Sequence, residues 1–370
     1  MRPSTQKLRA ETIGSLLQPE KLLRARQAAQ SGAISFAELR AIEDIAVDEA
    51  ISLQEEAGLD VVTDGEMRRP TWHDTSRHLL GLEPRGGERS YPSTAKGANS
   101  PGPDGRAILT VVDRISPKHD HPVGEEFPYL RVRATKPTKY TMAAPSYHRR
   151  NWVDHISTTA YDSCEEFLQD VRDWMNSVAH WLAAQGCGYI QLDAPNYGSL
   201  CDPATRQFHA EHGHDLESQI AFDAELDSSV FDGLEGVTSA IHVCRGNLPG
   251  GAWHSAGGYG VLADSLFRNL DVDVVLLEYD SGRAGDFSPI SAIAAGTTVV
   301  LGLLTTKDAA LETEKEIEAR IAEASSVRPL DDLAISTQCG FASFTNAPMS
   351  NDQQRAKLDL VGTTARRVWG

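Results

Sequence analysis

Short apolar runs alternate with segments of helical periodicity along most of this chain. The clearest helix is predicted to begin at a capping box, Ser35 to Glu38, in which each side chain bonds the backbone amide of the other. It is predicted to end at Gly58, since glycine commonly terminates helices. Between these limits apolar side chains recur at helical spacing, at Leu39, Ile42, Ala46 and Leu53.

Eight short runs have the composition of buried β-strands. They cover residues 12–15, 60–64, 139–142, 189–193, 239–244, 274–278, 297–302 and 333–337. Helices are predicted between most of them, over residues 164–185, 215–228, 260–269, 311–325 and 350–366. Continuous apolar runs are typical of parallel strands that are covered on both faces. The pattern therefore predicts an α/β fold, a single (β/α)8 barrel of the TIM type.

Residues 80–135 interrupt this alternation. They are rich in glycine, proline and charged residues and contain no clear helix. We interpret them as an insertion between the second and third strands, either a hairpin or a lid. No other shift in composition indicates a domain boundary, so residues 1–370 are predicted to form one barrel domain with this insertion.

Composition narrows the possible partners. The formal net charge is -17, whereas nucleic acids and anionic membranes require a basic face, so neither is expected as a partner. The start of the chain has no apolar signal region, and no apolar run approaches the ~18 residues that a membrane span needs. Five cysteines are too few for a disulfide framework. We expect a cytoplasmic protein with free thiols.

Polar residues gather at the predicted ends of the strands. In a TIM-type barrel the carboxyl ends of the strands surround one mouth, where the chemistry takes place. The residues at these ends are Ser15, Glu66, Asp193, His242, Cys244, Glu278 and Cys339. A packing scheme for an apolar core would not select this set.

His242 and Cys244 form the sharpest local feature. Residues i and i+2 of a strand share a face, so both side chains can reach one ion. Imidazole nitrogen and thiolate sulfur suit zinc, and Glu278 and Cys339 would complete four ligands. The alternative is that a lone His-x-Cys pair is two incidental buried residues.

The remaining cysteines, histidines and arginines have plainer interpretations. Cys164 and Cys187 are expected to act as small apolar residues, and Cys201 is a weaker alternative ligand. Surface positions are expected for the loop histidines and solvated positions for the arginine pairs, although an anionic cofactor or substrate could use these arginines. These residues are His73, His148, His254, Arg68-Arg69 and Arg149-Arg150.

The same segments resemble the catalytic barrel of the cobalamin-independent methionine synthase family. They are Ile13-Gly14-Ser15, residues 58–66, residues 190–193, His242-Val243-Cys244, Leu277-Glu278 and Gln338-Cys339-Gly340, and they follow the family's order over almost the whole chain. The resemblance is to short, single-barrel relatives. One departure is Asp193-Ala194-Pro195, because the family often has Asp-Glu-Pro there and a carboxylate is missing.

The resemblance implies a zinc-dependent methyltransferase. Zn²⁺ would be held by His242, Cys244, Glu278 and Cys339, and Ser15, Glu66 and Asp193 would hold the amino-acid part of homocysteine. A zinc-bound thiolate would attack a methyl group and give methionine. The implied partners are therefore a small-molecule thiol and an alkyl donor, either a methylated folate or another methyl carrier.

Two alternatives remain open. Epoxyalkane–coenzyme M transferases use a similar zinc thiolate to open an epoxide, and Arg68 or Arg69 could then face the sulfonate of coenzyme M. Glu66 and Asp193 argue against this, because carboxylates repel a sulfonate. In the second alternative the zinc is structural or stored, as in a regulatory protein.

Overall fold

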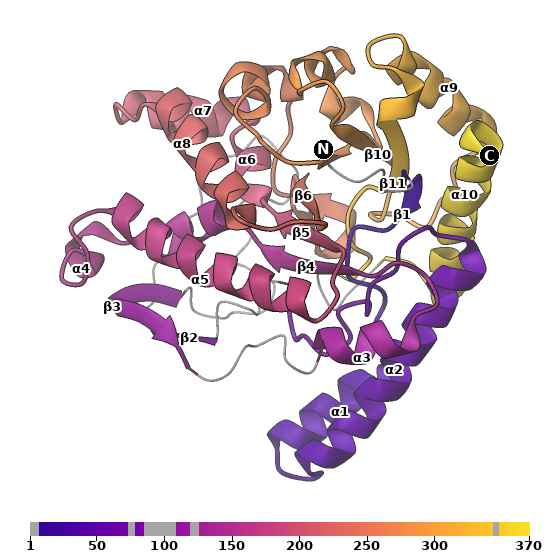
Figure 1. Ribbon diagram of the computed structural model, residues 1–370, viewed down its shortest axis with the longest axis horizontal. Coiled ribbons are helices and arrows are strands. Elements are labelled where there is room, and N and C mark those ends of the chain that lie inside the picture. Colours follow the sequence, from indigo (N-terminus) through magenta and orange to yellow (C-terminus); the bar gives the residue numbers. More distant parts are fainter. Residues whose placement is uncertain (1–6, 73–77, 85–108, 119–125, 343–347) are drawn as a thin grey trace.

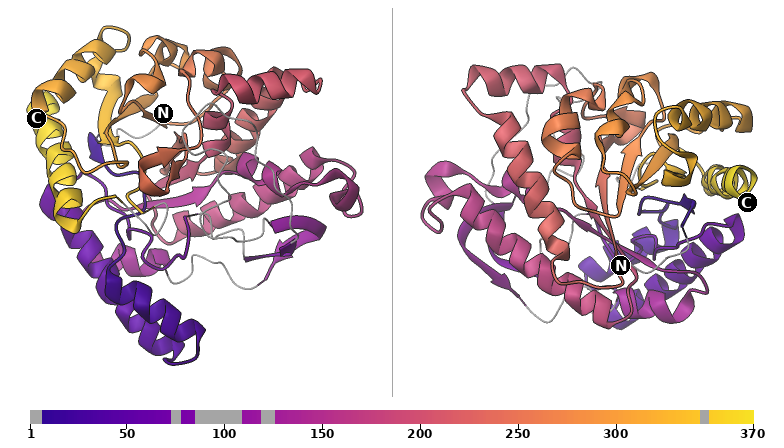
Figure 2. Two further views of the ribbon diagram at one scale, coloured as in Figure 1. Left: turned by 180° about the vertical axis from the view of Figure 1, so that it is seen from behind. Right: turned by 45° about the horizontal axis from the view of Figure 1, so that its top comes forward.

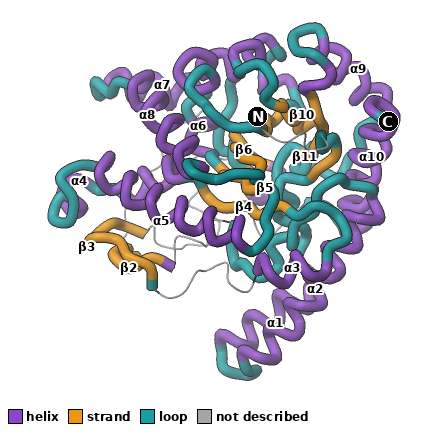
Figure 3. The backbone as a smooth tube through the Cα atoms, viewed as in Figure 1, coloured by secondary structure: helices purple, strands orange, loops and turns teal. Residues whose placement is uncertain are grey.

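The central strands of the computed structural model run parallel to one another. They are β1 Ala10–Glu11, β4 Lys139–Ala143, β5 Tyr189–Asp193, β6 Thr238–Val243, β9 Val274–Glu278, β10 Thr298–Leu304 and β11 Leu333–Thr337. The described residues are 7–72, 78–84, 109–118, 126–342 and 348–370. Within them the strands form one curled sheet in the order β1-β11-β10-β9-β6-β5-β4. Helices surround this sheet (Figures 1 and 3).

The segment of residues 60–64 acts as a short eighth strand and closes the sheet into a ring. Val62 forms a parallel bridge with Thr138, and its amide donates to the carbonyl oxygen of Pro137 at 3.0 Å. On its other side, the amide of Asp60 donates to the carbonyl oxygen of Ala10 at 2.8 Å. Pro137 has no amide hydrogen to extend this ladder. The architecture is the predicted TIM-type barrel, with its second strand reduced to a bridge.

Ten α-helices occur in the described part of the chain. They are α1 Glu20–Gln30, α2 Phe36–Ala57, α3 Glu126–Arg133, α4 Asp154–Ser157, α5 Cys164–Ala184, α6 Pro195–Ser199, α7 Pro203–Glu211, α8 Leu216–Ser228, α9 Glu314–Ser325 and α10 Asn351–Trp369. Helix α1 lies alongside α2, and this pair extends away from the barrel (Figure 2). None of the described helices is long and apolar enough to cross a lipid bilayer.

Local sequence signals explain the boundaries of α2. The Ser35 hydroxyl accepts a hydrogen bond from the Glu38 amide at 3.2 Å, and the Glu38 carboxylate accepts one from the Ser35 amide at 2.8 Å. Gly58 ends the helix with a φ of 80°, a left-handed conformation that favours glycine. The capping box and the glycine stop are both confirmed.

Two buried layers support the barrel. The larger layer lies between the sheet and the helices and includes Val47 and Ile51 of α2 and Phe167 and Val171 of α5. The smaller cluster consists mainly of strand residues, namely Ile13, Val61, Tyr189, Ala240, Val274, Leu276, Val300 and Ala334. This arrangement leaves the residues at the strand ends free to form a site.

Two predicted elements, a strand and a helix, were wrong. Residues 12–15 follow β1 instead of forming it, and the side chain of Thr12 bonds the Thr337 hydroxyl at 3.2 Å. The segment 260–269 is a 3-10 turn, Tyr259–Leu262, followed by a π-helical turn, Ala263–Phe267. Its apolar spacing does bury Leu262, but Gly258 and Gly260 disfavour a regular helix.

The segment 80–135 contains a hairpin and also a helix that the sequence did not predict. Strands β2 Leu79–Pro84 and β3 Leu109–Pro117 pair antiparallel beside α5, where Arg114 lies 3.4 Å from Asp170 (Figure 1). Helix α3 was missed because Pro128 reads as a helix breaker, although proline is tolerated in a first turn. Residues 85–108 and 119–125 lie outside the described residues.

Candidate functional site

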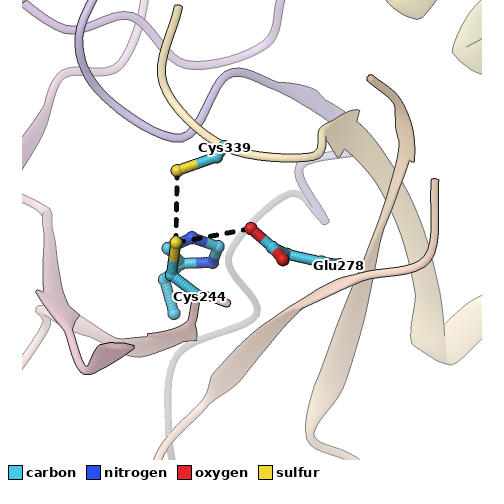
Figure 4. Close-up of side chains that lie close together, drawn as sticks. Cys244, Glu278 and Cys339 are labelled. Carbon is cyan, nitrogen blue, oxygen red and sulfur yellow. Dashed lines mark hydrogen bonds between the residues drawn. The ribbon is translucent and has the colours of Figure 1, made fainter. Parts of the chain in front are cut away.

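Four side chains meet at the carboxyl ends of three strands. His242 lies on β6, Cys244 directly follows β6, Glu278 ends β9, and Cys339 lies two residues beyond β11. One donor atom from each lies within 4.8 Å of the others, and all four residues are buried. The sulfur of Cys244 is 3.4 Å from that of Cys339 and 3.3 Å from Oε1 of Glu278 (Figure 4). The structure thus brings together the four residues predicted to bind zinc, which we call the donor cluster.

The carboxylate of Glu278 is held from several directions. Nε2 of Gln338 donates to its Oε1, and the amide of Arg245 donates to its Oε2 at 3.1 Å. Nη2 of Arg283 lies 3.2 Å from the same Oε2. Lys307 in turn donates to the side-chain oxygen of Gln338 at 2.9 Å. These bonds fix the orientation of a carboxylate that is fully buried.

The hydroxyl of Tyr259 joins the two strands that carry Cys244 and Glu278. It donates to the carbonyl oxygen of Val243 and accepts from the amide of Glu278, both at 2.9 Å. The guanidinium of Arg245 lies over the Tyr259 ring, 3.8 Å from its centroid, and donates to the carbonyl oxygen of Glu278. One buried hydroxyl therefore bridges β6 and β9 just beyond their backbone ladder, next to the donor cluster.

The two thiols of the donor cluster share a proton. The hydrogen bond from Cys244 lowers the pKa of Cys339 to about 5, and the same contact together with burial raises the pKa of Cys244 well above its usual range. Burial alone would lower the pKa of His242. The Cys339 sulfur and nearby carboxylates outweigh burial, so the pKa of His242 is raised overall. Before any ion binds, the site therefore already stabilises one thiolate.

The donor set fits a zinc ion. Nδ1 of His242 lies 3.3 Å from the carbonyl oxygen of Leu276, whereas its buried Nε2 has no hydrogen-bond partner among the described residues. Such a bond on one ring nitrogen leaves the other free as a ligand. Two sulfurs, an imidazole nitrogen and a carboxylate oxygen are the ligand types that zinc takes in proteins.

Glu66 and its neighbour Asp193 form the acidic side of the mouth. Glu66 has a φ of 57° and follows Gly65, whose φ is 66°, so the chain turns sharply there. Its Oε1 accepts from the Thr141 hydroxyl at 2.8 Å and lies 3.7 Å from Arg69, while Oε2 is buried without a hydrogen-bond partner. A side chain on Gly14 would begin 2.6 Å from Oε1, so the Glu66 carboxylate would have to move.

Asp193 links Glu66 to the donor cluster. It ends β5 opposite His242, and its Oδ1 accepts from Nε2 of Gln191 at 2.7 Å. Burial raises the pKa of Glu66 to about 8 against the lowering effect of Arg69, and the Asp193 charge adds to the rise. Burial also raises the pKa of Asp193 to about 6, with His242 opposing it. Two neighbouring buried carboxyls therefore keep raised pKa values, although Arg69 lies beside Glu66.

Ser15 lies against the loop that carries Cys339. Its carbonyl oxygen accepts from the Phe341 amide at 2.7 Å, and a side chain on Gly340 would begin 2.2 Å from its hydroxyl oxygen. The structure therefore places Ser15, Glu66 and Asp193 at the same mouth as the donor cluster.

Several polar residues near the mouth were missed or misjudged from the sequence. The side chains of Arg68 and Arg69 are only 3% exposed, so the prediction of solvated charge was wrong. Arg69 donates to the carboxylate of Glu126 on α3 at 3.0 Å. Thr141 lies near the carboxyl end of β4, so the sequence could have indicated it. The pairing of Arg69 with Glu126, 57 residues away, could not be predicted from the sequence.

The other candidates lie outside the donor cluster. His148 was expected at the surface but is buried, and burial lowers its pKa to about 4, while His254 is exposed. Cys201 is buried and its sulfur lies 3.9 Å from the carbonyl oxygen of Tyr197. Arg149 is bound to the carboxylate of Asp223 at 2.6 Å, and His73 lies outside the described residues.

Comparisons with known sequences identify relatives over nearly the whole chain. The family described as "Cobalamin-independent synthase, Catalytic domain" matches residues 8–74 and 163–353. The Bacillus subtilis (strain 168) protein named "Uncharacterized protein YxjH" is 32% identical over 368 residues, 98% of this chain and 94% of the relative. A methionine synthase of Pyrococcus abyssi (strain GE5 / Orsay) is 25% identical over 339 residues, 90% of this chain and 86% of the relative.

Solved structures resemble the fold as a whole. A Listeria monocytogenes protein provisionally named vitamin-B12 independent methionine synthase superposes with a TM-score of 0.75 at 27% identity, covering 99% of this chain and 100% of that one. A B12-independent methionine synthase from Shewanella sp. W3-18-1 gives 0.69 at 21% identity, covers 98% of both chains and supports the fold alone. This chain therefore belongs to the cobalamin-independent synthase family, as a methyltransferase-type catalytic domain.

Proposed function

We propose that this protein transfers a methyl group to a small thiol at a zinc ion held by His242, Cys244, Glu278 and Cys339. The observation that carries the proposal is the donor cluster itself, with four buried ligand groups within 4.8 Å at the mouth of the barrel. When bound, zinc would keep an acceptor thiol deprotonated near neutral pH, because a cation lowers the pKa of a sulfur ligand.

The acidic side of the mouth supports an acceptor that carries an ammonium group. Glu66 and Asp193 are buried carboxyls with raised pKa values, and a bound cation would offset the cost of ionising them. An amino-acid thiol such as homocysteine has such a group a few bonds from its sulfur, and methylation would give methionine. Ser15 would contact the same part of the substrate.

The residues around Glu278 would hold the reacting sulfur in a fixed direction. Gln338 and Arg283 bond the carboxylate, so it cannot swing freely when a substrate enters. Such fixed geometry reduces the entropy cost of an in-line attack on a methyl carbon. The donor would be a methylated folate or another methyl carrier, and its leaving group would take up a proton as the methyl group is transferred.

Arg68 and Arg69, the two arginines expected to face a sulfonate, do not support the coenzyme M alternative. Arg68 lies close to the carboxylates of Glu43 and Asp44, and Arg69 is bound to Glu126 and lies beside Glu66. Neither guanidinium is available to neutralise a sulfonate at the thiol site. A purely structural zinc fits poorly too, since the ligands come from three separate strand ends of a methyltransferase family.

Zinc-edge X-ray absorption on purified protein tests the proposal directly. We expect about two sulfur ligands in the resting site and a third after addition of homocysteine, but no change with the thiol-free amino acid homoserine. A site without zinc, or a sulfur shell that homocysteine leaves unchanged, would contradict the proposed function. Coenzyme M entering the shell in place of homocysteine would favour the epoxide alternative.

A further inference from the structure

Three buried hydrogen-bond donors beside Glu278 have no acceptor. Nε and Nη1 of Arg283 and Nε1 of Trp253 lack a hydrogen-bond partner among the described residues. The Arg283 side chain is only 9% exposed. A buried donor without an acceptor destabilises the fold, so three in one place require an explanation.

The contacts of Arg283 leave these two nitrogens unused. Its third nitrogen, Nη2, lies 3.2 Å from Oε2 of Glu278 and 3.5 Å from Oδ1 of Asp280. The guanidinium carbon lies over the Trp253 ring, 5.1 Å from its centroid. Lys307 binds Oδ2 of Asp280, while Oδ1 of Asp280, the oxygen that faces Nη2, has no hydrogen-bond partner among the described residues.

A small hairpin positions Trp253 there. Strands β7 Asn247–Leu248 and β8 Ala252–Trp253 pair antiparallel, and Asn247 donates to the Thr306 hydroxyl at 2.9 Å. Asn247 also accepts from Gln338, the residue that donates to Glu278. The hairpin is therefore tied to the donor cluster, and Trp253 is tied to Arg283.

The nitrogens left unused on Arg283 and Trp253 are all donors, so they call for an acceptor. Arginine presents a planar fork that matches the two oxygens of an oxyanion, and the indole nitrogen of tryptophan can only donate. The complementary ligand is therefore a carboxylate or a similar oxyanion. Trp253 would cover one face of the guanidinium and keep water away from the contact.

The position of this subsite indicates which reactant carries the anion. Asp193 and Glu66 lie on the β5 side of His242, whereas Arg283 lies behind Glu278 at the end of β9. The carboxylate of an amino acid sits on the same carbon as its ammonium group, so it cannot reach across the donor cluster. Building on the proposed function, we propose that Arg283 and Trp253 bind an oxyanion carried by the alkyl donor.

Isothermal titration of the zinc-loaded protein with acetate, and with neutral acetamide as the matched probe, tests this subsite. We expect saturable binding of acetate and none of acetamide. Arg283→Gln should weaken acetate binding about tenfold or more, and Trp253→Phe about threefold, because charged hydrogen bonds are the stronger ones. Arg268→Gln, at an exposed ion pair with Asp264, should have no effect. Methanesulfonate and phosphate in the same assay identify the preferred oxyanion.

Two results separate this inference from the proposed function. If acetate binds wild type and Arg283→Gln equally while homocysteine still enters the zinc shell, the subsite is overturned and the methyl transfer stands. If acetate binding requires Arg283 while no thiol enters the shell, the oxyanion site stands and the proposed function fails. Zinc content measured on every variant shows that loss of acetate binding is not loss of the metal.

Discussion

Two groups of buried polar residues lie inside this barrel, and they differ in how completely they are bonded. At the floor, Nζ of Lys139 donates to Glu11 at 2.6 Å, to the carbonyl oxygen of Thr12 at 2.6 Å and to Gln191 at 2.8 Å. An ammonium group has three hydrogens, so each has its acceptor. The Tyr189 hydroxyl also donates to Glu11 at 3.2 Å.

At the mouth, equally buried groups lack partners. Within the described residues, Oε2 of Glu66, Nε2 of His242 and two nitrogens of Arg283 have none. The residues at the floor and at the mouth are similarly buried, so the two groups differ in whether the protein itself supplies their hydrogen-bond partners. A complete network stabilises the fold, whereas an incomplete one at the carboxyl ends of barrel strands indicates where ligands bind.

The largest expected effect comes from breaking the floor. Lys139→Met leaves Glu11 buried without its counter-ion and should lower the free energy of unfolding by about 4 kcal/mol. Denaturant titration measures this loss. The double variant Lys139→Met with Glu11→Leu should recover most of the stability, because replacing a whole buried pair by apolar groups costs little. No recovery would mean that the lysine acts through packing and not through its charge.

At the mouth, Glu66→Gln should stabilise the protein at high pH. The pKa of Glu66 is raised from 4.5 to about 8, so the folded state keeps a proton that the unfolded state loses. Stability of the wild type therefore falls as pH rises from about 4.5 to about 8, and the glutamine variant escapes this fall. We expect a gain of several kcal/mol at pH 9 and none at pH 4.

Denaturant unfolding of zinc-free protein at both pH values checks the Glu66 prediction. The exposed Glu20→Gln should show no such pH dependence. A Glu66→Gln gain of equal size at pH 4 and pH 9 would show that ionisation of Glu66 is not the cause.

Removal of one donor should weaken zinc binding without unfolding the barrel. Cys244→Ala should bind zinc ~100-fold more weakly, measured by competition with a chromophoric chelator. Cys201→Ala removes a buried cysteine outside the donor cluster and should leave the affinity unchanged. The reverse order of the two variants would assign the metal to Cys201 and contradict the four-ligand site.

The smallest effect is expected from the hydroxyl that joins β6 and β9. Tyr259→Phe removes two hydrogen bonds next to Cys244 and Glu278, so zinc affinity should fall about tenfold, as for other groups that orient metal ligands. Tyr279→Phe is the matched control, because the hydroxyl of Tyr279 has no hydrogen-bond partner in the described structure. Chelator competition with both variants decides whether this bridge controls the metal.

The sequence predicted those parts of the site that follow from strand ends. His242, Cys244, Glu278 and Cys339 each lie at or just after the carboxyl end of a strand, and that rule was sufficient to group them. Alternation of strands and helices likewise predicted the barrel.

What the sequence could not predict depends on contacts between distant segments. In the sequence, Arg69 belongs to a pair of arginines that reads as solvated. In the structure it is buried and bonded to Glu126, at the start of α3, the helix whose first turn contains Pro128. Glu66 was predicted at the mouth from its place after a strand, but no residue pattern indicates its left-handed backbone conformation. The unpartnered nitrogens of Arg283 became visible only after its neighbours were placed.

The closure of the barrel at residues 60–64 has a consequence for motion. β10 pairs with β9 and β11 along its length. Residues 60–64, in contrast, are joined to their neighbours by few backbone hydrogen bonds. Regions with few such bonds open at lower free energy than the core of a sheet. Glu66 directly follows residues 60–64. The part of the mouth that carries Glu66 should therefore open locally more often than the part that carries the donor cluster. Amide hydrogens of residues 60–66 should accordingly exchange before those of β9 and β10.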